Sequence, residues 1–264
     1  MTKAKALLKS ILPASTYAGL VRGYRGWLAT RSYQRAGLVA NKLVARYGAE
    51  VREGPFKGMK LRLDAIGSAV SPKLVGSYEA EVHAAVETIV AGGYSRVLNI
   101  GCAEGFYAVG LALRMPQAEI WAFDIDPAAH AASAALAALN GVPQRLHIAG
   151  ECTHARLDEL CTEDTVIVCD IEGAEKELLD PTRAAGLRKA DILVEIHPTE
   201  TGESLEDLLE SRFAATHTCE MIPTAPRVGS DYPWLREGLT GAEVELALCE
   251  FRPIMHWGFF RRRR

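Results

Sequence analysis

The sequence has no apolar run long enough to cross a bilayer and no closely spaced pair of cysteines. A membrane-spanning helix needs about 20 consecutive apolar residues, and Lys9 and Pro13 interrupt the first apolar stretch, so we expect neither a transmembrane segment nor a cleaved signal peptide. The six cysteines form no C-x-x-C pair, which argues against a disulfide framework or a zinc site. We therefore expect a cytoplasmic protein.

Acidic residues are absent before Glu50, whereas lysine and arginine recur there, and the chain ends in Arg261–Arg264. The formal net charge of the whole chain is nevertheless -3, which argues against nucleic acid as a partner. We predict that residues 1–53 form a basic helical extension. Its interpretation is open between a solvated helix face, a lid over a pocket, a homodimer contact and weak binding to a membrane surface.

Strands and helices alternate after residue 90. With 264 residues, 48% of them hydrophobic, the chain can bury one large core. Apolar strands joined by helices predict a parallel sheet covered on both faces. We expect a single domain over residues 54–260 and a basic, disordered tail over 261–264. The predicted parallel strands are Arg96–Ile100, Glu119–Ile125, Arg145–Ala149, Thr165–Cys169 and Asp191–Ile196.

Further elements are predicted before and after these strands. The spacing of apolar residues predicts a helix over Tyr78–Val90, and Gly54–Gly58 predicts a turn before a short strand at Lys60–Leu63. His217–Ile222 and Glu243–Phe251 are expected to form an antiparallel hairpin at the sheet edge.

A glycine-bearing turn follows the first of the five strands. It runs from Asn99 through Gly101 and Gly105 to Tyr107, and in doubly wound sheets ligands bind at the carboxyl ends of the strands. Glycine lets a ligand approach the backbone closely. The turn also carries Glu104, whose carboxylate would repel a pyrophosphate but suits the ammonium group of a methionine moiety. This favours S-adenosylmethionine over NAD as the cofactor.

A carboxylate at the end of the second strand supports this prediction. Asp124 lies roughly 20 residues after the turn, where an acidic side chain accepts the ribose hydroxyls. Asp126 precedes Pro127 and is instead expected to cap the next helix. After the third strand, Glu151 and Cys152 are placed to meet the adenine, although an ordinary loop acid is an equally good interpretation of Glu151.

These motifs resemble the FkbM-type branch of class I methyltransferases. The matching segments, in chain order, are Gly54–Met59, Gly76–Glu79, Gly101–Tyr107, Asp170–Glu175 and Glu195–His197, and the resemblance spans about residues 54–198. Two positions differ from the family pattern: Asn99 stands where an acid is usual, and Glu104 where asparagine is frequent.

The resemblance implies a Rossmann-like class I methyltransferase fold, with a mostly parallel seven-stranded sheet and helices on both faces. It also implies O-methylation of a small-molecule hydroxyl, such as that of a natural product or a sugar. The residues expected to bind S-adenosylmethionine are Tyr78, Asn99, Gly101, Cys102, Ala103, Glu104, Gly105, Phe106, Asp124, Ile125, Glu151, Cys152 and Asp170.

Acidic residues and one histidine follow the fourth and fifth strands, where the cofactor's methyl group would lie. In one hypothesis Asp170 positions the substrate while Glu195 or His197 acts as the base. In another, Asp170, Glu172, Glu195 and His197 hold a divalent ion such as Mg²⁺. Structural interpretations stay open as well: Glu172 and Glu175 could charge a helix start, and His197 could be a strand-end histidine.

Two other functions are compatible with the pattern. An NAD-dependent oxidoreductase would be expected to carry a fuller G-x-G-x-x-G turn and no acid at position 104. A non-catalytic binding protein with the same fold would not need Gly101, Gly105 and Asp124 together.

Overall fold

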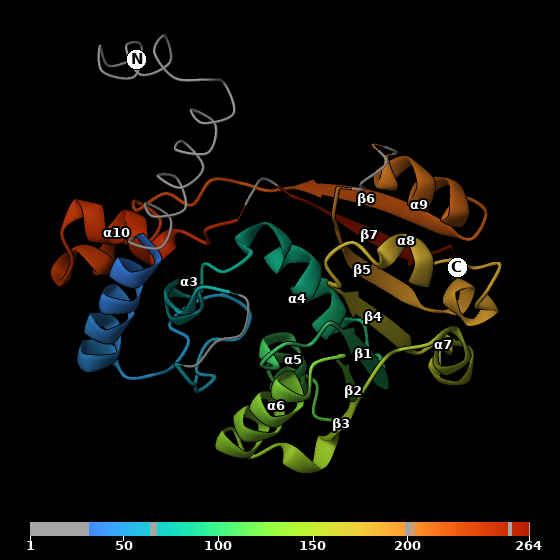
Figure 1. The fold of residues 1–264 in the computed structure, drawn as a ribbon, viewed down its shortest axis with the longest axis horizontal. Coiled ribbons are helices and arrows are strands. Elements are labelled where there is room, and N and C mark those ends of the chain that lie inside the picture. The colour runs from blue at the N-terminus through green and yellow to red at the C-terminus, as the bar shows by residue number, and fades with distance from the viewer. Residues whose placement is uncertain (1–31, 64–67, 199–201, 203, 253–254, 264) are drawn as a thin grey trace, which may run out of the picture.

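The computed structural model describes residues 32–63, 68–198, 202, 204–252 and 255–263. Its centre is a seven-stranded sheet with the order β3-β2-β1-β4-β5-β7-β6. The first five strands are parallel, and β7 runs antiparallel between β5 and β6 (Figure 1). The strands are β1 (Arg96–Ile100), β2 (Glu119–Phe123), β3 (Leu146–Ala149), β4 (Thr165–Cys169), β5 (Asp191–Ile196), β6 (His217–Pro223) and β7 (His256–Arg262).

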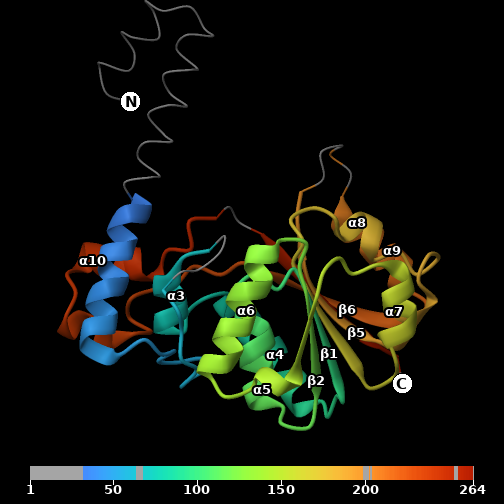
Figure 2. The same cartoon turned by 60° about the horizontal axis from the view of Figure 1, so that its bottom comes forward.

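Helices cover both faces of this sheet, as Figures 1 and 2 show from two directions. Helices α4, α5 and α6 lie on one face and α7, α8 and α9 on the other. The α-helices are α3 (Val70–Val75), α4 (His83–Ala91), α5 (Phe106–Arg114), α6 (Pro127–Leu139), α7 (His154–Leu160), α8 (Glu175–Leu178), α9 (Leu205–Phe213) and α10 (Gly241–Leu248). The 3₁₀-helices are η1 (Ala80–Val82), η2 (Pro143–Arg145), η3 (Ala185–Lys189) and η4 (Pro233–Glu237).

The two-sided covering explains the apolar runs of the central strands. Along β4, Val166 and Val168 belong to the core on one face, while Ile167 and Cys169 belong to the core on the other. Every residue of β4 is therefore buried, as is usual for a parallel sheet between two helix layers. The predicted Rossmann-like fold is confirmed, and β1, β4 and β5 have the predicted bounds.

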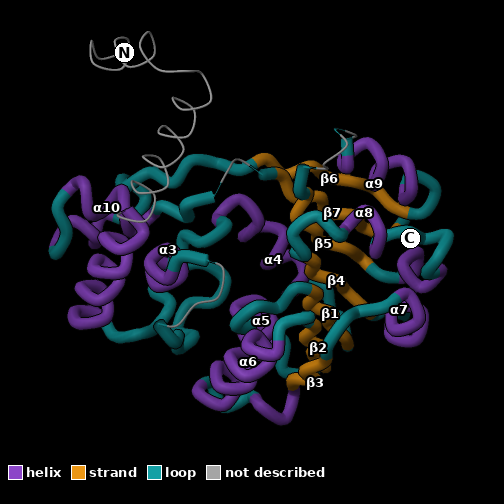
Figure 3. The backbone as a smooth tube through the Cα atoms, viewed as in Figure 1, coloured by secondary structure: helices purple, strands orange, loops and turns teal. Residues whose placement is uncertain are grey.

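The prediction of a last strand at Glu243–Phe251 is wrong. Residues 241–248 form α10 instead, and Thr240 and Glu243 make a capping box that starts the helix. Val244, Ala247 and Leu248 are buried, a spacing of three and four residues that belongs to a helix. The strand that pairs with β6 is β7, so the predicted antiparallel edge is confirmed with a different partner (Figure 3).

The predicted disordered tail is wrong at Arg261 and Arg262, which belong to β7. The backbone N–H of Arg262 donates to Asp191 at 2.9 Å, and that of Arg263 donates to Thr216 at 2.8 Å. Hydrogen bonds thus hold the end of β7 in the sheet through Arg263. Arg264 lies outside the described residues.

Two predictions before the sheet also need correction. The helix predicted from Tyr78 starts later, because Glu79 adopts a left-handed φ of 49° and η1 and α4 follow it. The described residues at Lys60–Leu63 form only an isolated bridge between Glu50 and Lys60, although the preceding turn is present. Such a short pairing leaves residues 49–63 as a loop against the core.

The basic N-terminal segment is described from residue 32 onward, where a helix spans 32–47. It contacts the α10 region through ion pairs of Lys42 with Glu243 and Arg46 with Glu237. The part of the predicted extension over residues 1–31 lies outside the described residues. None of the described helices is both long and apolar enough to cross a membrane.

Candidate functional site

A cavity of about 1450 Å³ opens at the carboxyl ends of the parallel strands. The glycine turn, the ends of β2 and β3, the residues after β4 and β5, and the segment around Arg252 all line it. Tyr33 and Gln34 from the helix over 32–47 contribute at its edge. Every residue predicted to bind the cofactor lines this cavity except Gly105.

The glycine turn requires glycine at two positions. Gly101 has a φ of 78°, and a Cβ atom there would lie 1.6 Å from the backbone oxygen of Asp170. Gly105 has a φ of 90° and precedes α5; a Cβ atom there would lie 2.8 Å from Ser133 Oγ. Left-handed backbone is costly for residues with a Cβ atom. The turn can therefore pass close under β4 and α6 only with these two glycines.

Asp124 holds the glycine turn while lining the cavity. Its Oδ2 accepts from the Ala103 backbone N–H at 2.9 Å, and its Oδ1 accepts from that of Asp126 at 2.9 Å. Asp126 in turn caps α6 by accepting from the Ala128 N–H at 2.8 Å, as predicted. The two neighbouring acids thus have different roles, and Asp124 is the one that faces the cavity. Ile125, next to it, also lines the cavity and is 81% exposed.

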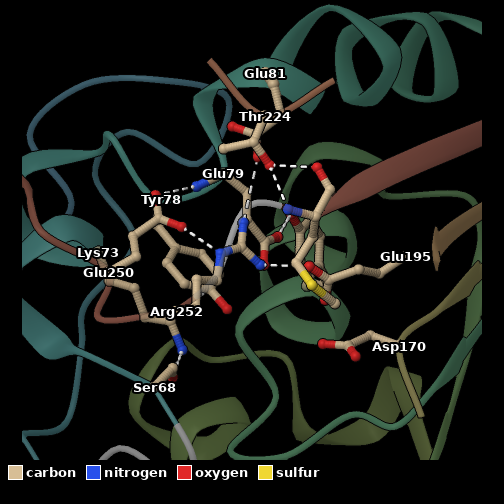
Figure 4. A network of polar contacts seen from close by, with 12 residues as sticks. Ser68, Lys73, Tyr78, Glu79, Glu81, Asp170, Glu195, Thr224, Glu250 and Arg252 are labelled. Carbon is tan, nitrogen blue, oxygen red and sulfur yellow. Dashed lines mark hydrogen bonds and ion pairs between the residues drawn. The ribbon is translucent and has the colours of Figure 1, made fainter. Parts of the chain in front are cut away.

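Glu104 has a cationic partner that the sequence analysis did not identify. Its carboxylate is buried and forms an ion pair with Lys73 of α3. Figure 4 shows the second contact of Lys73, in which Nζ donates to Ser68 Oγ at 2.7 Å. Lys73 Nζ lies 4.6 Å from the centre of the Tyr78 ring. This pairing weakens the sequence-based argument that Glu104 would repel a diphosphate, because the nearby ammonium offsets its charge.

Asn99 leaves a buried acceptor at the floor of the cavity. Its amide Nδ2 donates to the Val168 carbonyl at 3.3 Å, whereas its Oδ1 has no hydrogen-bond partner among the described residues. The side chain is 2% exposed. A buried oxygen without a partner carries a desolvation cost, which a bound donor would remove. A ligand N–H group that reached this oxygen next to the glycine turn would satisfy it.

His197 lies among carboxylates at the other end of the cavity. Its Nδ1 is 2.8 Å from Glu175 Oε1, and its Nε2 is 3.7 Å from Asp170 Oδ1, 3.3 Å from Glu172 Oε2 and 3.9 Å from Glu195 Oε2. The structure thus brings together all four residues predicted for catalysis or metal binding. Glu175, which starts α8 as a helix-charging acid would, also contacts this cluster.

Arg252 lies at the centre of a second group of acids behind this cluster. Its guanidinium contacts Glu79 at 3.0 Å, Glu195 at 2.6 Å and Glu250 at 2.8 Å, and Glu81 at 3.3 Å. Figure 4 shows the guanidinium among these carboxylates, with Asp170 beyond Glu195. A buried charge is stable only when it is paired, so Arg252 supplies countercharge that the acids need.

Burial and mutual repulsion shift the protonation of the acids. Burial, then the charges of Asp170 and Glu79, raise the pKa of Glu195 even though Arg252 opposes this. Burial and Glu79 likewise raise the pKa of Asp170. Burial alone would raise the pKa of Glu175, but its hydrogen bond to His197 lowers it overall. His197 is affected in the opposite way: burial lowers its pKa, and Glu175 more than reverses this.

We expect Glu195→Gln to stabilise the ligand-free protein at pH 8. A carboxyl whose pKa is raised on folding keeps a proton that the unfolded chain releases, so stability falls as pH rises from the unfolded pKa towards the folded one. Removing that titration should increase the free energy of unfolding at pH 8 by about 1 kcal/mol or more. Urea unfolding at pH 5 and pH 8 measures the difference. The exposed Glu245→Gln variant is the control, and equal pH slopes in all three proteins would contradict the prediction.

Sequence reasoning did not find several residues of the cavity. Lys73 and Arg252 had no assigned role, and Glu79 and Glu250 were not considered as part of the site, although all but Glu79 line the cavity. Arg252 lies 173 positions after Glu79, and no local motif links such distant residues. The sequence offers one local signal, an acid and an arginine two positions apart at Glu250 and Arg252.

Comparison with known proteins gives only distant likenesses. No family model and no curated sequence matches the chain, so the resemblance to FkbM-type enzymes stays a prediction. The O-methyltransferase TomG from Streptomyces achromogenes, involved in tomaymycin synthesis and solved in complex with SAM, is 14% identical; the match covers 72% of this chain and 82% of that chain, with a TM-score of 0.47.

Two further solved structures are similar to the same degree. A human methyltransferase 10 domain containing protein is 11% identical over 87% of this chain and 95% of that chain, with a TM-score of 0.49. An O-methyltransferase from Bacillus cereus in complex with SAH is 10% identical over 66% and 78%, with a TM-score of 0.44. Likenesses of this size carry no argument about the reaction, which has to be argued from the cavity itself.

Proposed function

We propose that this protein is an S-adenosylmethionine-dependent methyltransferase that acts on a hydroxyl of a small molecule. The observation that carries the proposal is Asn99 Oδ1, which has no hydrogen-bond partner in the described part of the chain and belongs to a residue that lines the same cavity as Asp124. An ammonium group of the cofactor's methionine part would donate to this oxygen, whereas a pyrophosphate has only acceptors to offer. The preference over NAD rests on this acceptor and on the absence of a third glycine in the turn.

The cofactor would lie along the carboxyl ends of β1, β2 and β3. Asn99 would receive its ammonium group, Asp124 its ribose hydroxyls, and Ile125 and Cys152 would flank its adenine. When bound, S-adenosylmethionine would supply an electrophilic methyl group for the acceptor oxygen, and the electron pair of the carbon–sulfur bond would stay on sulfur. The chain itself has to orient the acceptor hydroxyl and accept its proton.

The proton acceptor lies among the residues after β4 and β5. Asp170, Glu195 and His197 face the cavity from the strand ends, next to where the methyl group would lie. Asp170 is placed to position the hydroxyl, and Glu195 or His197 to take its proton. The O-methylation itself follows from the resemblance to FkbM-type enzymes and from the presence of these bases, which a hydroxyl needs more than a better nucleophile does.

A divalent metal does not fit this cluster well. Two groups of side chains, Asp170 with Glu175 and His197, and Asp170 with Glu79 and Glu195, have ligand atoms within 4.8 Å of one another. However, Arg252 contacts both Glu79 and Glu195, and His197 Nδ1 is engaged by Glu175. Mg²⁺ prefers an octahedral set of oxygens and retains water. We therefore propose a mechanism without Mg²⁺, in which Arg252 supplies the positive charge.

The N-terminal segment is proposed as a lid rather than a membrane or dimer contact. Tyr33 and Gln34 line the cavity, and Tyr33 also packs edge-on against Phe251, with ring centres 5.6 Å apart. A helix anchored beside α10 in this way can restrict entry of the acceptor. The homodimer and the membrane-surface contact stay predictions without such a supporting observation.

Replacing Asp124 with alanine tests the proposed cofactor site. We expect S-adenosylhomocysteine, measured by calorimetry, to bind about 10- to 100-fold more weakly, which is the usual cost of losing hydrogen bonds to a charged group. Asp126→Ala is the matched control: it removes the cap of α6 and should lower stability by about 1 kcal/mol while leaving the affinity unchanged. Asp124→Asn keeps an oxygen that can accept from the Ala103 N–H but removes the negative charge. Comparing it with Asp124→Ala separates the support of the glycine turn from the effect of the charge. Normal binding by Asp124→Ala would refute the ribose assignment.

A further inference from the structure

We propose that Glu175 is a positioning residue that fixes His197 with its proton on Nδ1, so that the Nε2 lone pair faces the cavity as the proton acceptor. This inference rests on the proposed methyltransferase function and selects one of its two candidate bases. It adds a residue outside the cavity lining to the reacting machinery. The geometry on which it rests is the His197–Glu175 contact, its anchoring and the surroundings of Nε2.

The two nitrogens of His197 face different surroundings. Nδ1 lies 2.8 Å from Oε1 of Glu175, whose side chain is fully buried, and His197 lines the cavity whereas Glu175 does not. A carboxylate accepts but does not donate. The buried Glu175 is closer to the ring than the exposed Glu172, which lies 3.3 Å from Nε2, so we assign the proton of the neutral ring to Nδ1. The other nitrogen is then an acceptor, because the hydrogen bond at one ring nitrogen sets the state of the other.

The backbone anchors Glu175 in place. Its Oε1 also accepts from the N–H groups of Ile171 at 3.2 Å and Gly173 at 3.3 Å. Those N–H groups converge because Glu172 and Gly173 adopt left-handed φ values of 54° and 108°. An acid held by two amides and a histidine keeps its orientation and its charge. The turn after β4 therefore serves to hold the carboxylate against the ring.

The charged groups around Nε2 leave His197 as the better acceptor. Asp170 from the end of β4, Glu172 from the turn and Glu195 from β5 face Nε2 at 3.3 to 3.9 Å. Glu195 is engaged by Arg252 at 2.6 Å and lies beside Asp170, so it is poorly placed to approach a substrate. In the proposed step the acceptor's O–H bond breaks, the proton moves to Nε2, and the resulting imidazolium lies between Glu175 and the cavity acids.

The test is the tautomer of His197, read from the ¹⁵N shifts of the imidazole in the full chain at pH 9. The signal is assigned by its loss in His197→Asn. We expect the native protein to show the Nδ1–H form, and Glu175→Met to move a large part of the population to Nε2–H. Glu175→Gln retains an acceptor oxygen and should restore the Nδ1–H form. Glu177→Met, an exposed acid of the same helix, should change nothing.

The outcomes separate this inference from the proposed function. An Nε2–H form in the native protein would overturn the positioning role, and so would a Glu175→Met spectrum like the native one. The first outcome needs only the native chain, so the test holds even if Glu175→Met does not fold. S-adenosylhomocysteine binding, measured by calorimetry on the same samples, reports on the cofactor alone. It should stay within about twofold in Glu175→Gln, which keeps an acceptor for the turn after β4 and lies outside the cavity lining. A native chain that fails to bind it would overturn the proposed function instead.

Discussion

Replacing Gly101 with alanine is expected to lower the free energy of unfolding by more than about 3 kcal/mol, a loss seen only for severe core defects. The new Cβ atom would lie 1.6 Å from the Asp170 carbonyl oxygen. That oxygen belongs to the backbone at the end of β4, so it cannot turn away as a side chain could. The φ of 78° adds a conformational cost of about 1 to 2 kcal/mol. Urea unfolding followed by circular dichroism measures the loss.

Gly141→Ala is the matched control for this substitution. Gly141 has a similar φ of 74°, but a Cβ atom there meets nothing within 4 Å. It should therefore show only the conformational cost, about 1 to 2 kcal/mol. The difference between the two variants isolates the contact between the glycine turn and β4. Equal destabilisation would mean that the turn does not pass as close to β4 as the structure shows.

Replacing Arg252 with methionine is expected to cost about 3 to 5 kcal/mol of stability, as removal of one partner from a buried ion pair does. The substitution keeps an unbranched apolar stem but removes the guanidinium, which is the countercharge of Glu79 and Glu195, both buried. The remaining acids would then take up protons, so the loss should be smaller at pH 5 than at pH 8. Thermal and urea unfolding at the two pH values measure it.

An exposed ion pair and a double variant make this prediction specific. Arg183 pairs with Glu177 at 3.3 Å, with 53% and 75% of the two side chains exposed, and Arg183→Met should cost less than about 1 kcal/mol. Adding Glu195→Gln to Arg252→Met should recover part of the loss, because one fewer buried carboxylate lacks a partner. If Arg252→Met were as mild as Arg183→Met, the buried network would not contribute to stability as described.

Local sequence signals were sufficient for the parallel half of the sheet. The bounds of β1, β4 and β5 could be predicted because nearly all residues of these strands are buried. The start of α6 could be predicted because Asp126 precedes a proline and caps the helix. Beyond β5 the same reasoning failed at Glu243–Phe251, where apolar and polar residues alternate as they do in a half-buried strand. The capping box of Thr240 and Glu243 was the competing signal.

The residues of the candidate site also fall into those that the sequence could predict and those that it could not. Gly101 and Asp124 lie in local motifs whose strand and turn context is readable from sequence. Lys73 and Arg252 could not be placed, since their partners Glu104 and Glu79 are 31 and 173 positions away. Such pairs arise from tertiary packing: Lys73 of α3 meets Glu104 of the glycine turn, and Arg252 meets Glu195 of β5.

Calorimetric titration of the native chain with S-adenosylhomocysteine, alongside NADH, tests the central claim most directly. The cavity, with Asn99 Oδ1 as an acceptor that no described residue uses and Asp124 at the end of β2, predicts saturable binding of S-adenosylhomocysteine at one site per chain and much weaker binding of NADH. Binding that is lost in Asp124→Ala but retained in Asp126→Ala would place it at the proposed site. Absence of S-adenosylhomocysteine binding, or tighter binding of NADH, would contradict the assignment as a methyltransferase.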